Sequence, residues 1–263
     1  MITIDLAQWI AWIDAFFYPL IRIASFVSLA PIFGESQVPV RVKIGLSVVL
    51  AIVMQAQIPP LATPVAPDSA QGIAMAVTQV LVGTALALAT RLIFAAVQIA
   101  GSFMGLEMDL SFATLFDPVT GANTDVVSEL LNVLALLLFV SLNAHLLLIE
   151  GLARTFALIP LDHLWITRDG AGALLAASAI IFTAGLVLAL PIIISLLLVN
   201  LMLGILNRTA QQLSVFSVGF PVTLLAGIFM VAESLPVIRG VLESLDSRSI
   251  EIMSEVARRL AGA

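Results

Sequence analysis

Two long apolar stretches dominate the sequence. Residues 170–207 contain no charged side chain, and residues 69–106 contain one, Arg91. As a single straight helix, each stretch would measure about 57 Å, against about 30 Å for the hydrocarbon of a bilayer. We therefore expect membrane helices that either break or project from the bilayer.

The composition of the whole chain points to the same class of protein. Its 263 residues are 61% hydrophobic and 11% charged, a balance outside the range of soluble domains. The absence of cysteine excludes disulfides, thiolate metal sites and cysteine nucleophiles. A net charge of −6 with scattered basic residues argues against nucleic acid as a partner. Residues 1–5 lack a basic region, so we expect no cleaved signal peptide.

The apolar runs predict an all-α membrane protein with about six long hydrophobic helices, some of them paired as helical hairpins. The expected runs cover residues 9–33, 44–58, 69–106, 130–149, 170–207 and 216–236. The fourth run carries no charge and is the cleanest span, and the last two form a helical hairpin. With six spans both termini lie on one side, and the distribution of basic residues favours the cytoplasm.

The C-terminal residues 237–263 differ from the rest because charged side chains alternate with apolar ones. Glu255 and Arg259 form an i,i+4 pair in the favourable order. The apolar residues at helical spacing are Leu242, Leu245, Ile252, Val256 and Leu260. This pattern predicts an amphipathic helix, either packed on a partner or exposed to water.

Several polar side chains interrupt the apolar runs. Arg22 lies inside the first run, where a charge usually has a partner, although snorkelling to the membrane surface is the alternative. Arg41 and Lys43 mark a membrane-interface end of the second run. Asn143 and His145 are expected to hydrogen-bond a neighbouring helix. A proton relay through His145 is the alternative interpretation.

The segment 101–124, between the third and fourth runs, is unusually apolar for a loop. Irregular backbone at membrane depth is tolerated where protein covers it or where it lines a cavity, and hydrophobic constrictions close pores by excluding water. The segment is therefore either a plug or a connection whose Phe112 and Phe116 pack as core. Gly101 and Gly105, four residues apart, permit close helix contact.

No signature of catalysis is found in the sequence. The patterns of zinc proteases, serine hydrolases, P-loop enzymes and dinucleotide-binding domains are all missing. Two histidines and no cysteine make a zinc site improbable. The acids of the central segment, Glu107, Asp109 and Asp117, have no basic or histidine neighbours in sequence that would complete a catalytic site. We expect neither enzymatic activity nor a cofactor.

Four blocks carry a family resemblance. They are residues 39–46 (PVRVKIGL), 105–118 (GLEMDLSFATLFDP), 136–149 (LLLFVSLNAHLLLI) and 206–221 (LNRTAQQLSVFSVGFP). In this order they resemble the FliR family, the R-type subunits of the flagellar type III protein-export gate. The T-type subunits of injectisomes are the sister group, and the second and fourth blocks favour the flagellar branch.

The resemblance implies a core subunit of an export gate. R-type subunits assemble with P-type and Q-type subunits (FliP and FliQ) into a closed pore in the bacterial inner membrane, at the flagellar basal body. Unfolded flagellar proteins are the export substrates, and FlhB and FlhA are further expected partners. Injectisome secretion, or a stand-alone small-solute or ion transporter, is the alternative.

The resemblance also implies a division of the chain and a set of site residues. Residues 1–169 resemble a P subunit, residues 170–236 resemble a Q subunit, and residues 237–263 form the C-terminal helix. The residues implied to plug or border the pore are Met104, Met108, Phe112, Leu115, Phe116, Asp117 and Pro118. Those implied at subunit interfaces are Arg22, Arg41, Lys43, Arg91, Gly101, Gly105, Asn143, His145, Arg208 and Gln212.

Two positions depart from the family pattern. Asp109 stands where glycine is usual, so the backbone of the loop is expected to differ there. Gln211 stands where proline is common, which affects the turn before the last run. In an isolated chain we expect Arg22, Arg91 and Arg208 to be exposed and to need partners.

Overall fold

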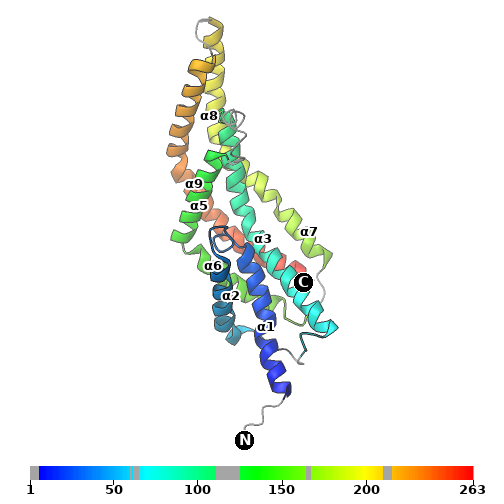
Figure 1. Cartoon of the computed structure of the whole chain (residues 1–263). Coiled ribbons are helices and arrows are strands. Elements are labelled where there is room, and N and C mark those ends of the chain that lie inside the picture. Colours follow the sequence, from blue (N-terminus) through cyan, green and yellow to red (C-terminus); the bar gives the residue numbers. More distant parts are fainter. Residues whose placement is uncertain are drawn as a thin grey trace. The chain divides into compact units, whose positions relative to one another are not determined.

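The computed structural model describes residues 6–59, 61, 65–110, 125–163, 167–209 and 215–262. Within these ranges all regular secondary structure is helical (Figure 1). The helices are α1 (Leu6–Leu29), α2 (Val40–Met54), the short 3₁₀ helix η1 (Gln55–Gln57), α3 (Ala70–Glu107), α5 (Val126–Ser141), α6 (Ala144–Leu158), α7 (Arg168–Ala177), α8 (Ala179–Thr209) and α9 (Val215–Ala261). The predicted all-α class is confirmed.

Most of the expected membrane spans are found among the described residues. In the described part of the chain, four helical segments are long and apolar enough to cross a membrane, or five if the broken pair α5 and α6 counts as one span. The segments are Val40–Gln57, Ala70–Glu107, Asp169–Arg208 and Gly219–Val241. Within the first apolar run, the segment Ala15–Leu29 is apolar but shorter than these four segments.

The two long apolar stretches behave differently. The stretch from residue 69 becomes α3, one unbroken helix of 38 residues. The stretch from residue 170 is interrupted after Ala177 and continues as α8. Pro191 lies inside α8 without ending it, as is common where apolar helices pack in membranes.

The expected fourth span is broken in the structure. Residues 130–149 contribute to α5 and α6, which are separated by Leu142 and Asn143. Asn143 has φ 57°, in the left-handed region that helices do not contain. Hydropathy averages over such a residue, so the absence of charge there did not reveal the break.

The last helix is longer than predicted. α9 has 47 residues and contains both Pro221 and Pro236. The change in composition near residue 237 is therefore not a helix boundary. The likeness of residues 1–169 to a P subunit and of residues 170–236 to a Q subunit stays a prediction.

The chain forms two compact units, each with its own core. The first unit contains α1, α2, residues 70–92 of α3, α6, α7 and residues 247–261 of α9. Its fully buried side chains include Tyr18, Phe26, Met75, Leu86 and Phe156. The Tyr18 hydroxyl donates to the carbonyl of Val65 (3.1 Å), which connects α1 to the segment before α3.

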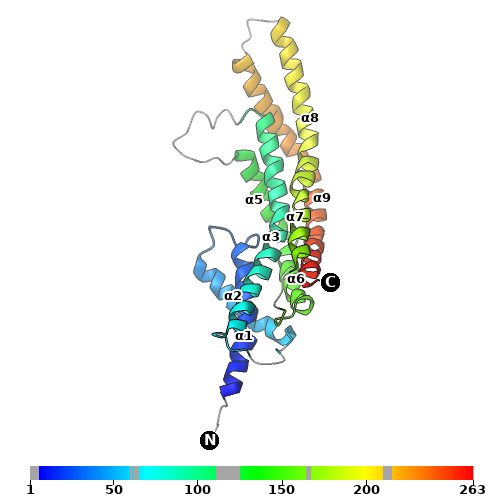
Figure 2. The same ribbon diagram turned by 90° about the vertical axis from the view of Figure 1, so that its right-hand side faces the viewer.

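The second unit contains residues 93–107 of α3, α5, α8 and residues 215–246 of α9. Phe94 and Phe139 meet edge to face with ring centroids 5.4 Å apart. Figure 1 and Figure 2 both show α8 beside the first part of α9, the arrangement expected of a hairpin. Only 22% of the apolar window of α8 is buried inside the chain, against 56% for α3. The apolar surface of α8 is therefore left for lipid or for other proteins.

Candidate functional site

The end of α3 carries the two predicted plug residues that the structure describes, Met104 and Met108, and one face of α9 covers it. Met104 and Met108 are both fully buried within the second unit. A Cβ atom on Gly227 of α9 would lie 2.5 Å from Cγ of Met108, so the methionine lies directly on the glycine. Phe112, Leu115, Phe116, Asp117 and Pro118 lie outside the described residues.

Asp109 terminates α3 in a left-handed conformation, with φ 60°. Its amide donates to the carbonyl of Leu106, and the amide of Leu110 donates to the carbonyl of Gly105, both at 3.1 Å. This pair of bonds is the Schellman arrangement, which usually places glycine at the left-handed position. Asp109 thus adopts the backbone conformation typical of glycine at this position, and the expected difference in the backbone stays a prediction. One carboxylate oxygen also accepts a hydrogen bond from Thr223 (3.2 Å).

Arg22 forms the most extensive polar cluster in the first unit. It is fully buried, and its Nε donates to Oε1 of Gln79 (2.6 Å). Its two terminal nitrogens donate to the carbonyls of Thr155 (3.2 Å) and Ile159 (2.8 Å). The guanidinium carbon also lies 4.3 Å from the ring centroid of Phe156, within the range of a cation–π interaction.

These two carbonyls lie at the C-terminal end of α6, where the helix dipole favours a cation. The Thr155 carbonyl also accepts from the Ile159 amide (2.8 Å), whereas Ile159 lies past the last residue of the helix, where carbonyls lack intrahelical donors. Arg22 therefore caps α6 from inside the chain. The expectation that an isolated chain exposes Arg22 is wrong, because its donors are used internally. The role of Gln79 was not predicted from the sequence, because it is one of three glutamines in the third apolar run and nothing in the run distinguishes it.

The other basic residues predicted at interfaces lie nearer the surface. Arg41 and Arg208 are exposed, and no ion pair among the described residues includes either. Lys43 donates to the carbonyl of Gly34 (2.9 Å). Arg91 lies 3.5 Å from a carboxylate oxygen of Glu35, with its side chain 42% exposed. Gln212 lies outside the described residues.

Gly101 and Gly105 differ in how closely α5 approaches them. A Cβ on Gly101 would overlap Cα of Ser128 and lie 2.7 Å from its nitrogen. A Cβ on Gly105 would meet only ordinary contacts, the nearest being Cβ of Asp125 at 3.8 Å. The close helix contact expected at Gly101 therefore occurs within this chain, between α3 and α5.

Asn143 and His145 do not make the interhelical hydrogen bonds expected of them in the described part of the chain. Asn143 is exposed, and its side chain does not cap α6. Nδ1 of His145 is buried and finds no hydrogen-bond partner among the described residues. Both residues mark the break between α5 and α6 rather than a polar contact between spans.

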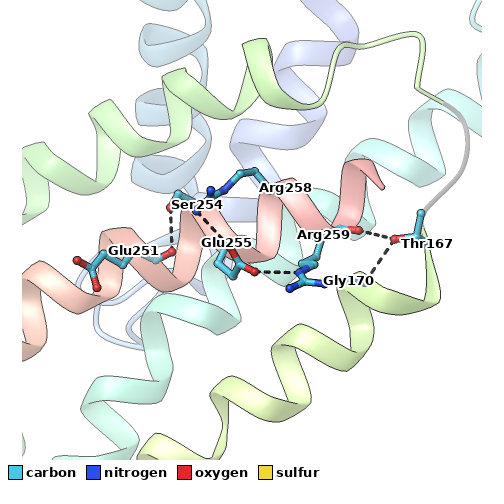
Figure 3. Close-up of polar contacts among 7 residues, drawn as sticks. All are labelled: Thr167, Gly170, Glu251, Ser254, Glu255, Arg258 and Arg259. Atoms are coloured by element: carbon cyan, nitrogen blue, oxygen red, sulfur yellow. Dashed lines mark hydrogen bonds and ion pairs between the residues drawn. The ribbon is translucent and has the colours of Figure 1, made fainter. Parts of the chain in front are cut away.

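The end of α9 packs on its own chain, which neither sequence alternative anticipated. Met253, Val256, Ala257 and Leu260 are all 3% exposed or less. Figure 3 shows Thr167, at the start of α7, pointing to the Arg259 carbonyl, to which its hydroxyl donates. The same hydroxyl oxygen caps α7 by accepting from the amide of Gly170.

The exposed side of this helix segment carries a local charge network (Figure 3). Glu255 pairs with Arg259 (2.9 Å) and with Arg258 (3.2 Å). The hydrogen bond from Arg259 is the main cause that lowers the pKa of the Glu255 carboxyl below its usual value. Glu255 therefore keeps its charge to a lower pH than an ordinary glutamate does.

A metal centre is not formed by the described side chains, because no three histidine or acidic residues among them converge. Thr223 and Gly227, which hold the end of α3, were missed by the sequence analysis. Their spacing of four residues places them on one helix face, which the sequence does indicate. The sequence does not indicate that this face contacts the end of α3.

Comparison with known proteins decides the family. Residues 13–248 match the family described as bacterial export proteins, family 1. The chain belongs to this family. The bacterial export proteins similar to it include the flagellar biosynthetic protein FliR of Pectobacterium carotovorum, which is 41% identical over 263 residues and covers all of both chains. The FliR of Escherichia coli K12 is 40% identical over 260 residues, 99% of each chain.

A more distant member of the family keeps the same extent. The flagellar biosynthetic protein FliR of Bacillus subtilis is 34% identical over 242 residues, 91% of this chain and 93% of the relative. The similarity therefore covers both compact units and the whole length of α3. The resemblance to the FliR family seen in four sequence blocks is confirmed.

Proposed function

We propose that this chain is the R-type subunit of a flagellar type III protein-export gate in the bacterial inner membrane. The observation that carries the proposal is the full-length match to flagellar biosynthetic proteins named FliR. The candidate membrane spans agree with an integral membrane location. Its role is structural and gating, as a non-enzymatic transport component.

The partners in this proposal are P-type and Q-type subunits (FliP and FliQ), with FlhB and FlhA at the same complex. Support comes from the large apolar surface that the chain leaves uncovered. The side chains of Leu201, Met202 and Ile205 near the end of α8 are each at least 60% exposed. Arg41 and Arg208, exposed near apolar surface, are suited to pairing with acidic groups of neighbouring subunits. Arg22 is left out of the proposed interface because it is occupied internally.

In the proposed gate, the segment after α3 plugs the pore. The apolar residues Phe112, Leu115 and Phe116 would exclude water and ions from a passage wide enough for an unfolded polypeptide. The segment must move aside when a substrate enters. Asp117 and Pro118 are assigned to the same plug.

Co-purification tests the assembly. A tagged chain is isolated from membranes of its source bacterium, and the proteins that accompany it are identified by mass spectrometry. The proposal expects P-type and Q-type export subunits in stoichiometric yield. Recovery of a homo-oligomer without them, active in moving small solutes, would favour a stand-alone transporter and overturn the proposal.

A double substitution tests the plug. Replacing Phe112 and Phe116 with glycine should increase the passive ion conductance of cells without reducing assembly of the complex. The matched control replaces both with leucine, which preserves apolar volume and should keep the pore tight. Unchanged conductance in the glycine variant, with normal assembly, would remove the plug assignment while leaving the subunit assignment intact.

A further inference from the structure

The end of α3 is held in a conformation that its own residue type does not favour. Asp109 has φ 60° and completes the Schellman arrangement through its amide and that of Leu110. The left-handed conformation costs energy for any residue with a Cβ atom, although aspartate tolerates it better than most. An interaction of the aspartate side chain would offset part of this cost.

The interaction is a hydrogen bond to α9. Oγ1 of Thr223 lies 3.2 Å from a carboxylate oxygen of Asp109, and Thr223 is 1% exposed. The hydroxyl also lies near the carbonyls of Gly219 (3.2 Å) and Phe220 (3.0 Å), but its single proton serves one acceptor at a time. A hydrogen bond to a charged acceptor is stronger than one to a neutral carbonyl. We therefore take the Asp109 carboxylate as the preferred acceptor of this proton.

A second contact reinforces the first on the same face of α9. Gly227 follows Thr223 by four residues, so both lie on one side of the helix. The Met108 side chain covers Gly227 so closely that a Cβ there would lie 2.5 Å from Cγ, 2.6 Å from Cε and 2.8 Å from Sδ. Met108 is fully buried as a result. One polar and one apolar contact thus attach consecutive residues of the α3 end to α9.

We propose that Asp109 and Thr223 are positioning residues that fix where the chain leaves α3. The pair orients the Schellman turn against α9, so the following segment begins from a defined point on that helix. The consequence for gating rests on the proposed function of this segment as a plug. If the segment is a plug, loss of the Asp109–Thr223 bond makes the turn that precedes it more mobile, while the apolar residues of the plug are unchanged.

A double-mutant cycle in the assembled complex tests the pair. The variants are Asp109→Gly, Thr223→Val and the double variant, with amide hydrogen exchange of residues 104–110 as the first measurement. We expect Thr223→Val to speed exchange about fivefold in the parent chain, as for a lost hydrogen bond of ordinary net strength. In the Asp109→Gly background the same substitution should have no further effect, because the carboxylate is already absent.

Conservative variants separate positioning from general destabilisation. Asp109→Asn and Thr223→Ser keep an acceptor and a hydroxyl, so exchange should stay near that of the parent chain. Thr183→Val is the matched control, because the exposed hydroxyl of Thr183 bonds only its own helix, at Ala179 (3.1 Å). If Thr223→Val prevents assembly, Thr223→Ala takes its place in the cycle.

Passive ion conductance is the second measurement and links the pair to the plug. Conductance should be higher in Thr223→Val than in the parent chain, and Thr223→Ser should have the conductance of the parent chain. Additive effects of Asp109→Gly and Thr223→Val on hydrogen exchange would overturn the positioning role. If coupling is seen in exchange but neither these variants nor the Phe112 and Phe116 glycine variant leaks, the positioning role stands and the plug function fails.

Discussion

Gly101 of α3 lies against the backbone of Ser128 of α5, and a Cβ atom on Gly101 would come within 2.7 Å of the Ser128 nitrogen. Because backbone atoms cannot rotate away as a flexible side chain can, Gly101→Ala should force the two helices apart. We expect a loss of about 1–3 kcal/mol in stability, typical of overpacking. Thermal unfolding of the purified chain in detergent measures the effect.

Gly105 supplies the matched control for that substitution. Its added Cβ would meet nothing closer than 3.8 Å, so Gly105→Ala should leave the unfolding temperature nearly unchanged. Equal destabilisation by the two substitutions would contradict the contact with Ser128 as the cause, because alanine is the better helix former and helix propensity alone would stabilise both variants.

Arg22 should be among the most sensitive positions for stability. Arg22→Met keeps much of the volume but leaves the acceptors on Gln79 and Ile159 without their buried donor, while the Thr155 carbonyl keeps its bond from the Ile159 amide. Each unsatisfied buried polar group costs about 1–3 kcal/mol, so the variant should unfold at a clearly lower temperature or fail to accumulate. Arg41→Met, at an exposed position of α2, is the control and should be stable alone.

Arg22→Lys distinguishes the charge from the geometry. Lysine keeps a positive charge but cannot reproduce the planar fork that reaches two carbonyls and an amide together. We expect a stability between those of the parent chain and Arg22→Met. Full stability of the lysine variant would mean that charge at the end of α6 is sufficient.

The break between α5 and α6 should depend on the backbone of Asn143. Its φ of 57° is tolerated by asparagine and glycine but is strained for β-branched residues. Asn143→Gly should therefore preserve stability, whereas Asn143→Val should cost about 1–2 kcal/mol. Comparing unfolding temperatures of the two variants tests the break without touching any buried side chain, since Asn143 is exposed.

The docking of the C-terminal helix should persist in mild acid. The lowered pKa of Glu255 means that its charged form is favoured in the folded chain, mainly by the bond from Arg259. The stabilisation that charged Glu255 gives to the folded chain is therefore fully present above the ordinary glutamate pKa, and it is lost as the pH falls through the lowered pKa. Hydrogen exchange of residues 250–260, corrected for the intrinsic pH dependence of amide exchange, should accelerate at a lower pH than an ordinary glutamate would give. Glu255→Gln should abolish this pH dependence, and high salt should weaken it.

The sequence predicted what depends on composition and local pattern. Apolar runs such as residues 69–106 indicated the long helices, and four sequence blocks indicated the family. The amphipathic pattern around Val256 was also correct, because Arg258 and Arg259 are exposed while Val256 and Leu260 are buried. What the pattern could not supply was the surface they pack on, which is formed by α6 and α7 of the same chain.

The remaining differences have a common physical cause, the dependence of single residues on partners distant in sequence. Gln79 and Arg22 are 57 residues apart, and Thr223 and Asp109 are 114 apart. Neither pair has a periodic signature in the sequence. The break at Asn143 was not predicted for a different reason: one left-handed residue does not change the mean hydropathy of the residues around it.

The internal cap on α6 also has a consequence for biosynthesis. The ribosome makes Arg22 long before its acceptors, since Thr155 and Ile159 follow it by 133 and 137 residues. Until those residues emerge, the nascent first helix carries a cation that lacks its final hydrogen bonds, and hydrocarbon is a costly place for such a group. The first helix therefore reaches its native surroundings late in translation. A truncation that ends before α6 should leave it poorly retained in the lipid phase.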